Sequence, residues 1–154
     1  MRAILILVIL FIVNLSAEML RIGDIFPNYT IKNQFAKEIQ YNDKIGLIVV
    51  SYDRNSTALF NEMVKKLDIK APYNFIIDVS GAPKAVIELF IKPGMQEYQK
   101  DILMSEDKEF NLKLPYKDDA SLAFIYLDSG KIEDIKYASE QKEIDELVSQ
   151  YMAN

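Results

Sequence analysis

Polar side chains that could do chemistry follow an apolar run in the stretch IVVSYDRNSTALF, residues 48–60. They supply a phenol, a carboxylate, a guanidinium, an amide and two hydroxyls, from Tyr52, Asp53, Arg54, Asn55, Ser56 and Thr57. A hydroxyl at the start of a helix could act as a nucleophile that gains from the helix dipole. The chain has no histidine, which excludes a Ser-His-Asp triad, and Lys65 and Lys66 lie about two helical turns away. We therefore expect Ser56 and Thr57 to belong to a helix cap, and an enzyme that uses Ser56 or carboxylates is the alternative.

Metal and cofactor sites have no support in the sequence. Zinc sites draw mainly on cysteine and histidine, and the chain contains neither. The stretches SEDKE (105–109) and KDDAS (117–121) carry carboxylates, but neither matches an EF-hand loop, so we expect solvated turns. No glycine-rich phosphate-binding motif is present. We expect no cofactor and no metal.

Composition predicts a folded domain that does not bind nucleic acid. The chain has 154 residues, half of them apolar, which is enough for one domain with a sizeable core. Its 18 Lys and Arg residues against 23 Asp and Glu residues give a net charge of −5, with no basic block. Nucleic-acid binding needs a positive surface, so this class of partner is excluded.

The N-terminal stretch MRAILILVILFIVNLSA has the layout of a secretory signal peptide: Arg2, an apolar run from Ala3 to Val13, and Ser16-Ala17. The apolar run is far shorter than the roughly 20 residues of a membrane-spanning helix. We expect a signal peptide over 1–17 with cleavage after Ala17, a periplasmic protein, and no membrane span after cleavage. An uncleaved anchor and a buried strand are the alternatives. Residues 18–154 are expected to form one domain.

The first half of that domain reads as a hairpin, a buried strand and a helix. Alternating apolar and polar residues over 21–44 predict an extended segment and a short hairpin packed through Tyr29, Ile31, Ile39 and Tyr41. The continuous apolar run 45–52 predicts a strand buried on both faces. Asn55 and Ser56 are suitable N-cap residues. Apolar residues then recur at helical spacing, at Leu59, Phe60, Met63, Val64 and Leu67.

The second half continues this α/β order. Residues 73–79 predict a second buried strand, followed by a helix that has Pro83 in its first turn, is well buried over 85–91, and breaks or kinks at Lys92-Pro93-Gly94. Residues 102–104 are a short strand candidate, and 110–116 is either a strand or a helical turn. Residues 121–127 and 131–137 predict a hairpin that turns at Gly130. The apolar spacing of Ile144, Leu147, Val148, Tyr151 and Met152 predicts the closing helix.

This order, with GDIFP (23–27) near its start and LDSGKI (127–132) near its end, resembles the thioredoxin-like fold. The stretch IGDIFPNYTI looks like the start of peroxiredoxins and thiol-disulfide proteins, and the chain is similar to the YtfJ-like family of small exported proteins of Gram-negative bacteria. The resemblance implies a three-layer α/β/α sandwich with a central mixed sheet and an N-terminal β-hairpin. It implies a periplasmic location and no particular reaction.

Both halves of the usual redox site are missing. Thiol chemistry needs a thiolate, and residues 52–56 contain none. The stretch 118–124, which matches the place of the catalytic relatives' cis-proline, has no proline. We therefore expect a cysteine-less, non-catalytic domain that binds an envelope protein, with a small-molecule ligand as the alternative. The candidate binding surface is Tyr52, Asp53, Arg54, Asn55, Ser56, Thr57, Asp118 and Asp119.

Overall fold

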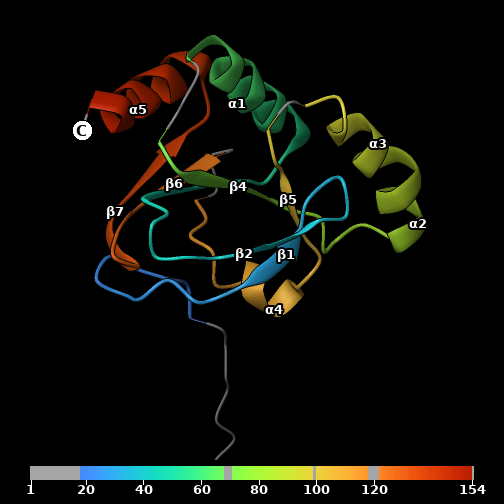
Figure 1. Cartoon of the computed structure of the whole chain (residues 1–154), viewed down its shortest axis with the longest axis horizontal. Coiled ribbons are helices and arrows are strands. Elements are labelled where there is room, and N and C mark those ends of the chain that lie inside the picture. The colour runs from blue at the N-terminus through green and yellow to red at the C-terminus, as the bar shows by residue number, and fades with distance from the viewer. Residues whose placement is uncertain (1–17, 68–70, 99, 118–121, 154) are drawn as a thin grey trace, which may run out of the picture.

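A five-stranded mixed sheet forms the centre of the molecule (Figure 1). The computed structural model describes residues 18–67, 71–98, 100–117 and 122–153. The strand order is β5-β4-β3-β6-β7. The strands are β3 (Leu47–Ser51), β4 (Tyr73–Asp78), β5 (Leu103–Ser105), β6 (Leu122–Asp128) and β7 (Lys131–Ala138). β3 is parallel to β4, and β4 to β5, whereas β6 is antiparallel to both β3 and β7. This is the α/β class that the sequence predicts.

The middle of the sheet is apolar because it is covered on both faces. Every residue of β3 is buried, and Val49 pairs with Phe75 of β4 on one side and Phe124 of β6 on the other. The strands predicted over 45–52 and 73–79 are confirmed. β3 passes directly into α1 (Arg54–Leu67), which brings the polar stretch 52–57 to the carboxyl end of the parallel strands.

One face of the sheet is covered by α1 and α5 (Gln141–Ala153), which lie over it together in Figure 1. Phe60 and Met63 of α1 and Val148 of α5 are almost completely buried in the same cluster. The rings of Phe60 and Phe75 have centroids 4.5 Å apart. Burial of side chains of this size stabilises a fold by about 1.5–3 kcal/mol each. The two amphipathic helices predicted from spacing are therefore present.

The other face is covered by the N-terminal segment, the hairpin of β1 (Thr30–Lys32) and β2 (Glu38–Gln40), and α4 (Lys108–Asn111). Tyr29, Ile31 and Tyr41 are buried there and Ile39 is partly buried, as predicted. The hairpin is a sheet of its own rather than part of the central one. The open question over 110–116 is answered by α4, whose start is capped by Asp107 through the amide N–H groups of Glu109 and Phe110.

The hairpin of β6 and β7 turns through Ser129 and Gly130, whose φ angles are 49° and 83°. Positive φ at both central residues matches the right-handed twist of the flanking strands, and glycine adopts it without strain. The predicted hairpin over 121–127 and 131–137 is confirmed by β6 and β7 and by the pairing of Asp128 with Lys131.

Residues 84–95 correct two predictions. They form one helical run of α2 (Lys84–Val86), the π-helix η1 (Ile87–Ile91) and α3 (Lys92–Met95), with Pro83 just before the first turn. The stretch 85–91 is not well buried, because Leu89 is 68% and Phe90 72% exposed. The run continues through Pro93, so the predicted break is absent, but the helix changes from π to α at Lys92, within the stretch predicted to break or kink. The amide N–H of Lys92 donates to the carbonyl oxygen of Ile87, and this wider turn precedes the proline, which cannot donate.

No helix within the described ranges combines the length and apolar character that crossing a membrane requires. The predicted signal peptide, 1–17, lies outside the described residues.

Candidate functional site

A pocket of about 370 Å³ opens where β3 and β4 end and α1 begins. The carboxyl ends of parallel strands are a common place for ligands in α/β folds. The polar lining comes from Ser51, Tyr52, Asp53, Arg54, Thr57 and Asp78. The apolar lining comes from Ile77, Val79, Phe90, Ile91, Met95 and Tyr98. The pocket therefore lies between the start of α1 and the helical run 84–95.

The hydroxyls at the floor of the pocket are held by the protein itself. Ser51 Oγ and Thr57 Oγ1 are 2.8 Å apart, and each lies 2.9 Å from the carbonyl oxygen of Asp53. Both residues are buried. These bonds close the turn that leads from β3 into α1, so they act on the structure of the junction.

Asp53 is the residue that caps α1. It directly precedes the helix, and its Oδ1 accepts a hydrogen bond of 3.0 Å from the amide N–H of Ser56. The hydroxyl of Ser56 donates to the other carboxylate oxygen of Asp53. This corrects the prediction of Asn55 or Ser56 as the N-cap, since both lie within the first turn. Ser56 is only 1% exposed and does not line the pocket, and Asn55 is exposed outside it.

Tyr52 connects the pocket to the segment before β6. Its hydroxyl donates to the carbonyl oxygen of Pro115, and its ring meets that of Tyr116 edge-on with centroids 5.1 Å apart. Burial raises the pKa of Tyr52 well above its ordinary value, so the phenol keeps its proton. The neighbouring Asp118 and Asp119, predicted as part of the same surface, lie outside the described residues.

Arg54 is the charged donor at the pocket. Its side chain is exposed and makes no hydrogen bond or ion pair with any residue that the structure describes. Burial raises the pKa of the Tyr98 phenol, and the charge of Arg54 acts in the opposite direction. Both residues line the pocket. The two donors come from opposite walls, α1 and the end of α3.

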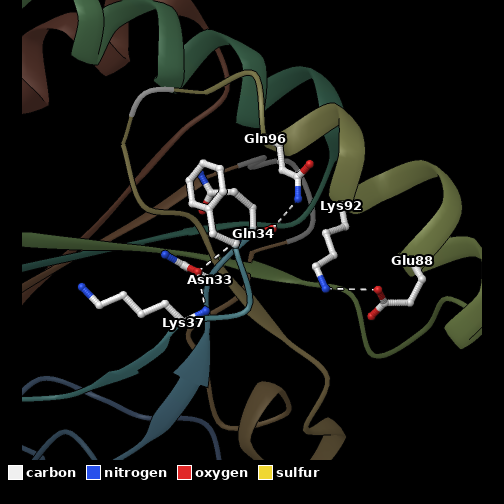
Figure 2. A network of polar contacts seen from close by, with 7 residues as sticks. Asn33, Gln34, Lys37, Glu88, Lys92 and Gln96 are labelled. Carbon is white, nitrogen blue, oxygen red and sulfur yellow. Dashed lines mark hydrogen bonds and ion pairs between the residues drawn. The ribbon is translucent and has the colours of Figure 1, made fainter.

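The wall formed by the helical run is braced by the tip of the β1–β2 hairpin (Figure 2). Gln96 Nε2 donates to the backbone carbonyl oxygen of Gln34 at 3.1 Å. Gln34 is completely buried; its Nε2 donates to the Lys100 carbonyl oxygen at 2.8 Å, and its Oε1 accepts from the Ile102 amide N–H at 2.8 Å. Asn33 adds a bond of 2.8 Å to Asp101. The hairpin tip is remote in sequence from the segment that follows α3, and these hydrogen bonds hold that segment in place.

The sequence predicts the wall of this pocket formed by residues 52–57, but not the opposite wall formed by residues 90–98. Phe90 comes from the stretch 85–91, which is predicted to be well buried, and Met95 and Tyr98 follow the predicted break or kink at 92–94. The charges Lys84, Glu88 and Lys92 recur every four residues, and Glu88 and Lys92 form an exposed ion pair of 3.1 Å. Such spacing marks a solvent-facing stripe and could have indicated that the flanking Leu89 and Phe90 are exposed.

The described residues contain no candidate metal site. Within residues 18–67, 71–98, 100–117 and 122–153, no group of three or more potential ligand residues is placed to hold a metal ion.

No protein-family model matches the chain, and no curated protein matches it. Solved structures do match. The thioredoxin domain of a thiol-disulfide oxidoreductase from Bacteroides vulgatus is 12% identical with a TM-score of 0.58, covering 86% of this chain and 99% of that one. A thiol:disulfide interchange protein of Chlorobium tepidum is 11% identical with a TM-score of 0.56, covering 84% and 97%. An exposed lipoprotein thioredoxin of Streptococcus pneumoniae is 12% identical with a TM-score of 0.56, covering 82% and 98%.

These similarities show that the chain has the thioredoxin-like fold. The chain contains no cysteine, so it has no thiol with which to carry out disulfide exchange.

Proposed function

We propose that this protein is an exported, non-catalytic thioredoxin-like domain, related to the YtfJ-like proteins, that binds an envelope protein. The binding face is formed by residues 52–57, the pocket beside them and η1. The observation that carries the proposal is the exposure of two large apolar side chains at this place, Leu89 at 68% and Phe90 at 72%. Apolar side chains gathered at a hollow surface are typical of interaction sites.

A small-molecule ligand is the second candidate. The pocket volume of about 370 Å³ is within the range of small-molecule sites, about 300–1,000 Å³, and mixed apolar and polar walls are common in them. A ligand that binds only the folded protein must raise its melting temperature, so a thermal-shift screen tests this candidate.

Crosslinking in cells tests the leading proposal. A photoreactive residue at position 54 or 90 is expected to capture the same envelope protein, identified by mass spectrometry. The matched control is position 142 on α5, where the Lys142 side chain is 85% exposed but lies outside the pocket. Equal capture from all three positions contradicts the proposal. Enzyme-like turnover by the purified protein, lost in Ser56→Ala or Asp53→Asn, also contradicts it.

A further inference from the structure

The apolar side chains and the charged groups that line the pocket together define which kind of ligand would fit it. Ile77 and Val79, at the end of β4, and Met95 of α3 are buried side chains that line it, and Phe90 stands at its exposed side. This lining provides an apolar compartment, which favours a hydrocarbon body.

The carboxylates that line the pocket already have donors from the protein. Asp53 accepts from the amide N–H and the hydroxyl of Ser56. Oδ1 of Asp78 accepts from the Ser80 amide N–H at 2.9 Å, the Ser80 hydroxyl at 2.7 Å and Asn111 Nδ2 at 2.6 Å. These neutral donors occupy hydrogen-bonding positions of both carboxylates but leave their charge in place, so a cationic ligand is the alternative that the probes below compare.

The donors that remain are Arg54 and Tyr98. Among the residues the structure describes, the Arg54 guanidinium has no acceptor, although its fork of N–H groups matches a carboxylate. Tyr98 also lines the pocket, and burial raises the pKa of its phenol, which therefore keeps its proton. Tyr98 therefore supplies a second, neutral donor from the other wall of the pocket.

We propose that the pocket binds an apolar carboxylate, with its hydrocarbon body between Phe90, Met95 and the end of β4 and its carboxylate on Arg54 beside Tyr98. This inference rests on the proposed function, because it names the chemistry of the group that the binding face accepts. The same chemistry is found in a free apolar acid and in the C-terminal apolar residue of a protein chain.

Three probes with unbranched tails of nearly equal length and different head groups test the charge requirement. The protein purified from cells expressing the full chain is titrated with decanoate, decanol and decyltrimethylammonium by isothermal titration calorimetry. Decanoate is expected to bind about tenfold or more tighter than the other two, since hydrogen bonds to charged groups are the stronger ones. Arg54→Gln should remove this preference and leave decanol binding unchanged. The matched control is Arg21→Gln, because Arg21 pairs with Glu18 outside the pocket.

A second variant tests the place of binding. A Cβ added at Gly94, which lines the pocket, meets no atom within 4 Å. Gly94→Phe should therefore fold, as checked by circular dichroism, and abolish binding of decanoate. Gly81→Phe is the control, because Gly81 has the same free space but does not line the pocket.

A peptide that ends in Leu-Phe, with a free or an amidated C-terminus, distinguishes a free apolar acid from the C-terminal carboxylate of a protein chain. Preference for the free terminus assigns the carboxylate to a protein chain, and binding of decanoate alone assigns it to a free acid.

Equal binding of decanoate and decanol, tighter binding of the cation, no binding of any probe, or no effect of Arg54→Gln overturns the inference. If crosslinking from position 54 still captures a protein, the proposed function survives that failure. Decanoate binding without any captured protein supports the inference and contradicts the protein partner.

Discussion

At the scale of single residues, the strand-to-helix junction contains no cysteine and is held by hydrogen bonds from polar side chains. The position that begins the helix here holds Asp53, whose carboxylate satisfies the first turn of α1. Ser51 and Thr57 complete the turn with hydroxyl hydrogen bonds. These side chains thus stabilise the local structure of the junction, whereas Arg54 is the side chain on which the proposed carboxylate binding depends.

Asp53→Ala is expected to lower the free energy of unfolding by about 1–2 kcal/mol, because the Ser56 amide N–H loses its acceptor. Urea denaturation followed by far-ultraviolet circular dichroism measures the change. Asp53→Asn keeps an acceptor and should retain most of the stability. Asn55→Ala, in the same turn but exposed, should change it little. A larger loss in Asn55→Ala than in Asp53→Ala would show that the cap is misassigned.

At the scale of elements, the helical run 84–95 depends on contacts that come from distant parts of the chain. The tip of the β1–β2 hairpin reaches the segment between α3 and β5 and binds it through Gln34 and Gln96 (Figure 2). The apolar rim of the pocket belongs to this run, so the hairpin helps to set the position of one wall of the pocket.

Gln34→Ala is expected to destabilise the fold by about 2 kcal/mol or more. The substitution leaves the Lys100 carbonyl group and the Ile102 amide N–H without the partner that they have in the native protein. Hydrogen exchange should show faster exchange at Ile102 than in the unmodified protein. The control is Phe35→Ala at the same tip, since Phe35 is 53% exposed. Unchanged exchange at Ile102 in Gln34→Ala would contradict the bracing role.

The same elements show what local sequence patterns can and cannot predict. β3, α1 and α5 follow from the spacing of their apolar residues, because each buries one face or both in the nearest core. The stretch 85–91 has apolar residues on most sides, which predicts burial, yet nothing in the described structure covers Leu89 and Phe90. Its exposure depends on which elements pack against it. Likewise, residues 52–57 are local to one junction, whereas the opposite pocket wall at 90–98 arrives only through the folded topology.

At the scale of the whole molecule, the N-terminal segment protects both edges of the central sheet. Ile25 forms a bridge with Lys131 of β7, and Asn33 forms one with Leu103 of β5. Unpaired sheet edges invite association with other chains. Between these two bridges the segment contributes Phe26, Tyr29 and Ile31 to the core of the hairpin face. The N-terminal part of the domain is therefore integral to the fold.

Tyrosines packed against the core under α1 and α5 make the protein less stable at alkaline pH, whereas its stability changes little around neutral pH. The chain has no histidine and no cysteine, so no side chain has an ordinary pKa near neutrality. Burial raises the pKa of Tyr73 and of Tyr126 to about 12 each. The unfolded chain releases these protons from about pH 10, whereas the folded protein retains them. Unfolding is therefore favoured as pH rises from about 10 towards 12, and stability is fully present below that window.

We expect the free energy of unfolding to be nearly constant from about pH 6 to 9 and to fall steeply above about pH 10, with Tyr73 alone contributing roughly 2 kcal/mol by pH 12. Urea denaturation at a series of pH values measures this profile. Tyr73→Phe keeps the buried ring and its edge-on contact with Phe60, but removes the proton, so its profile should fall less steeply above pH 10. Tyr116→Phe is the matched control, because Tyr116 is 45% exposed. A loss of stability already between pH 6 and 9, or identical slopes for Tyr73→Phe and the unmodified protein, would show that buried phenols do not control the alkaline limit.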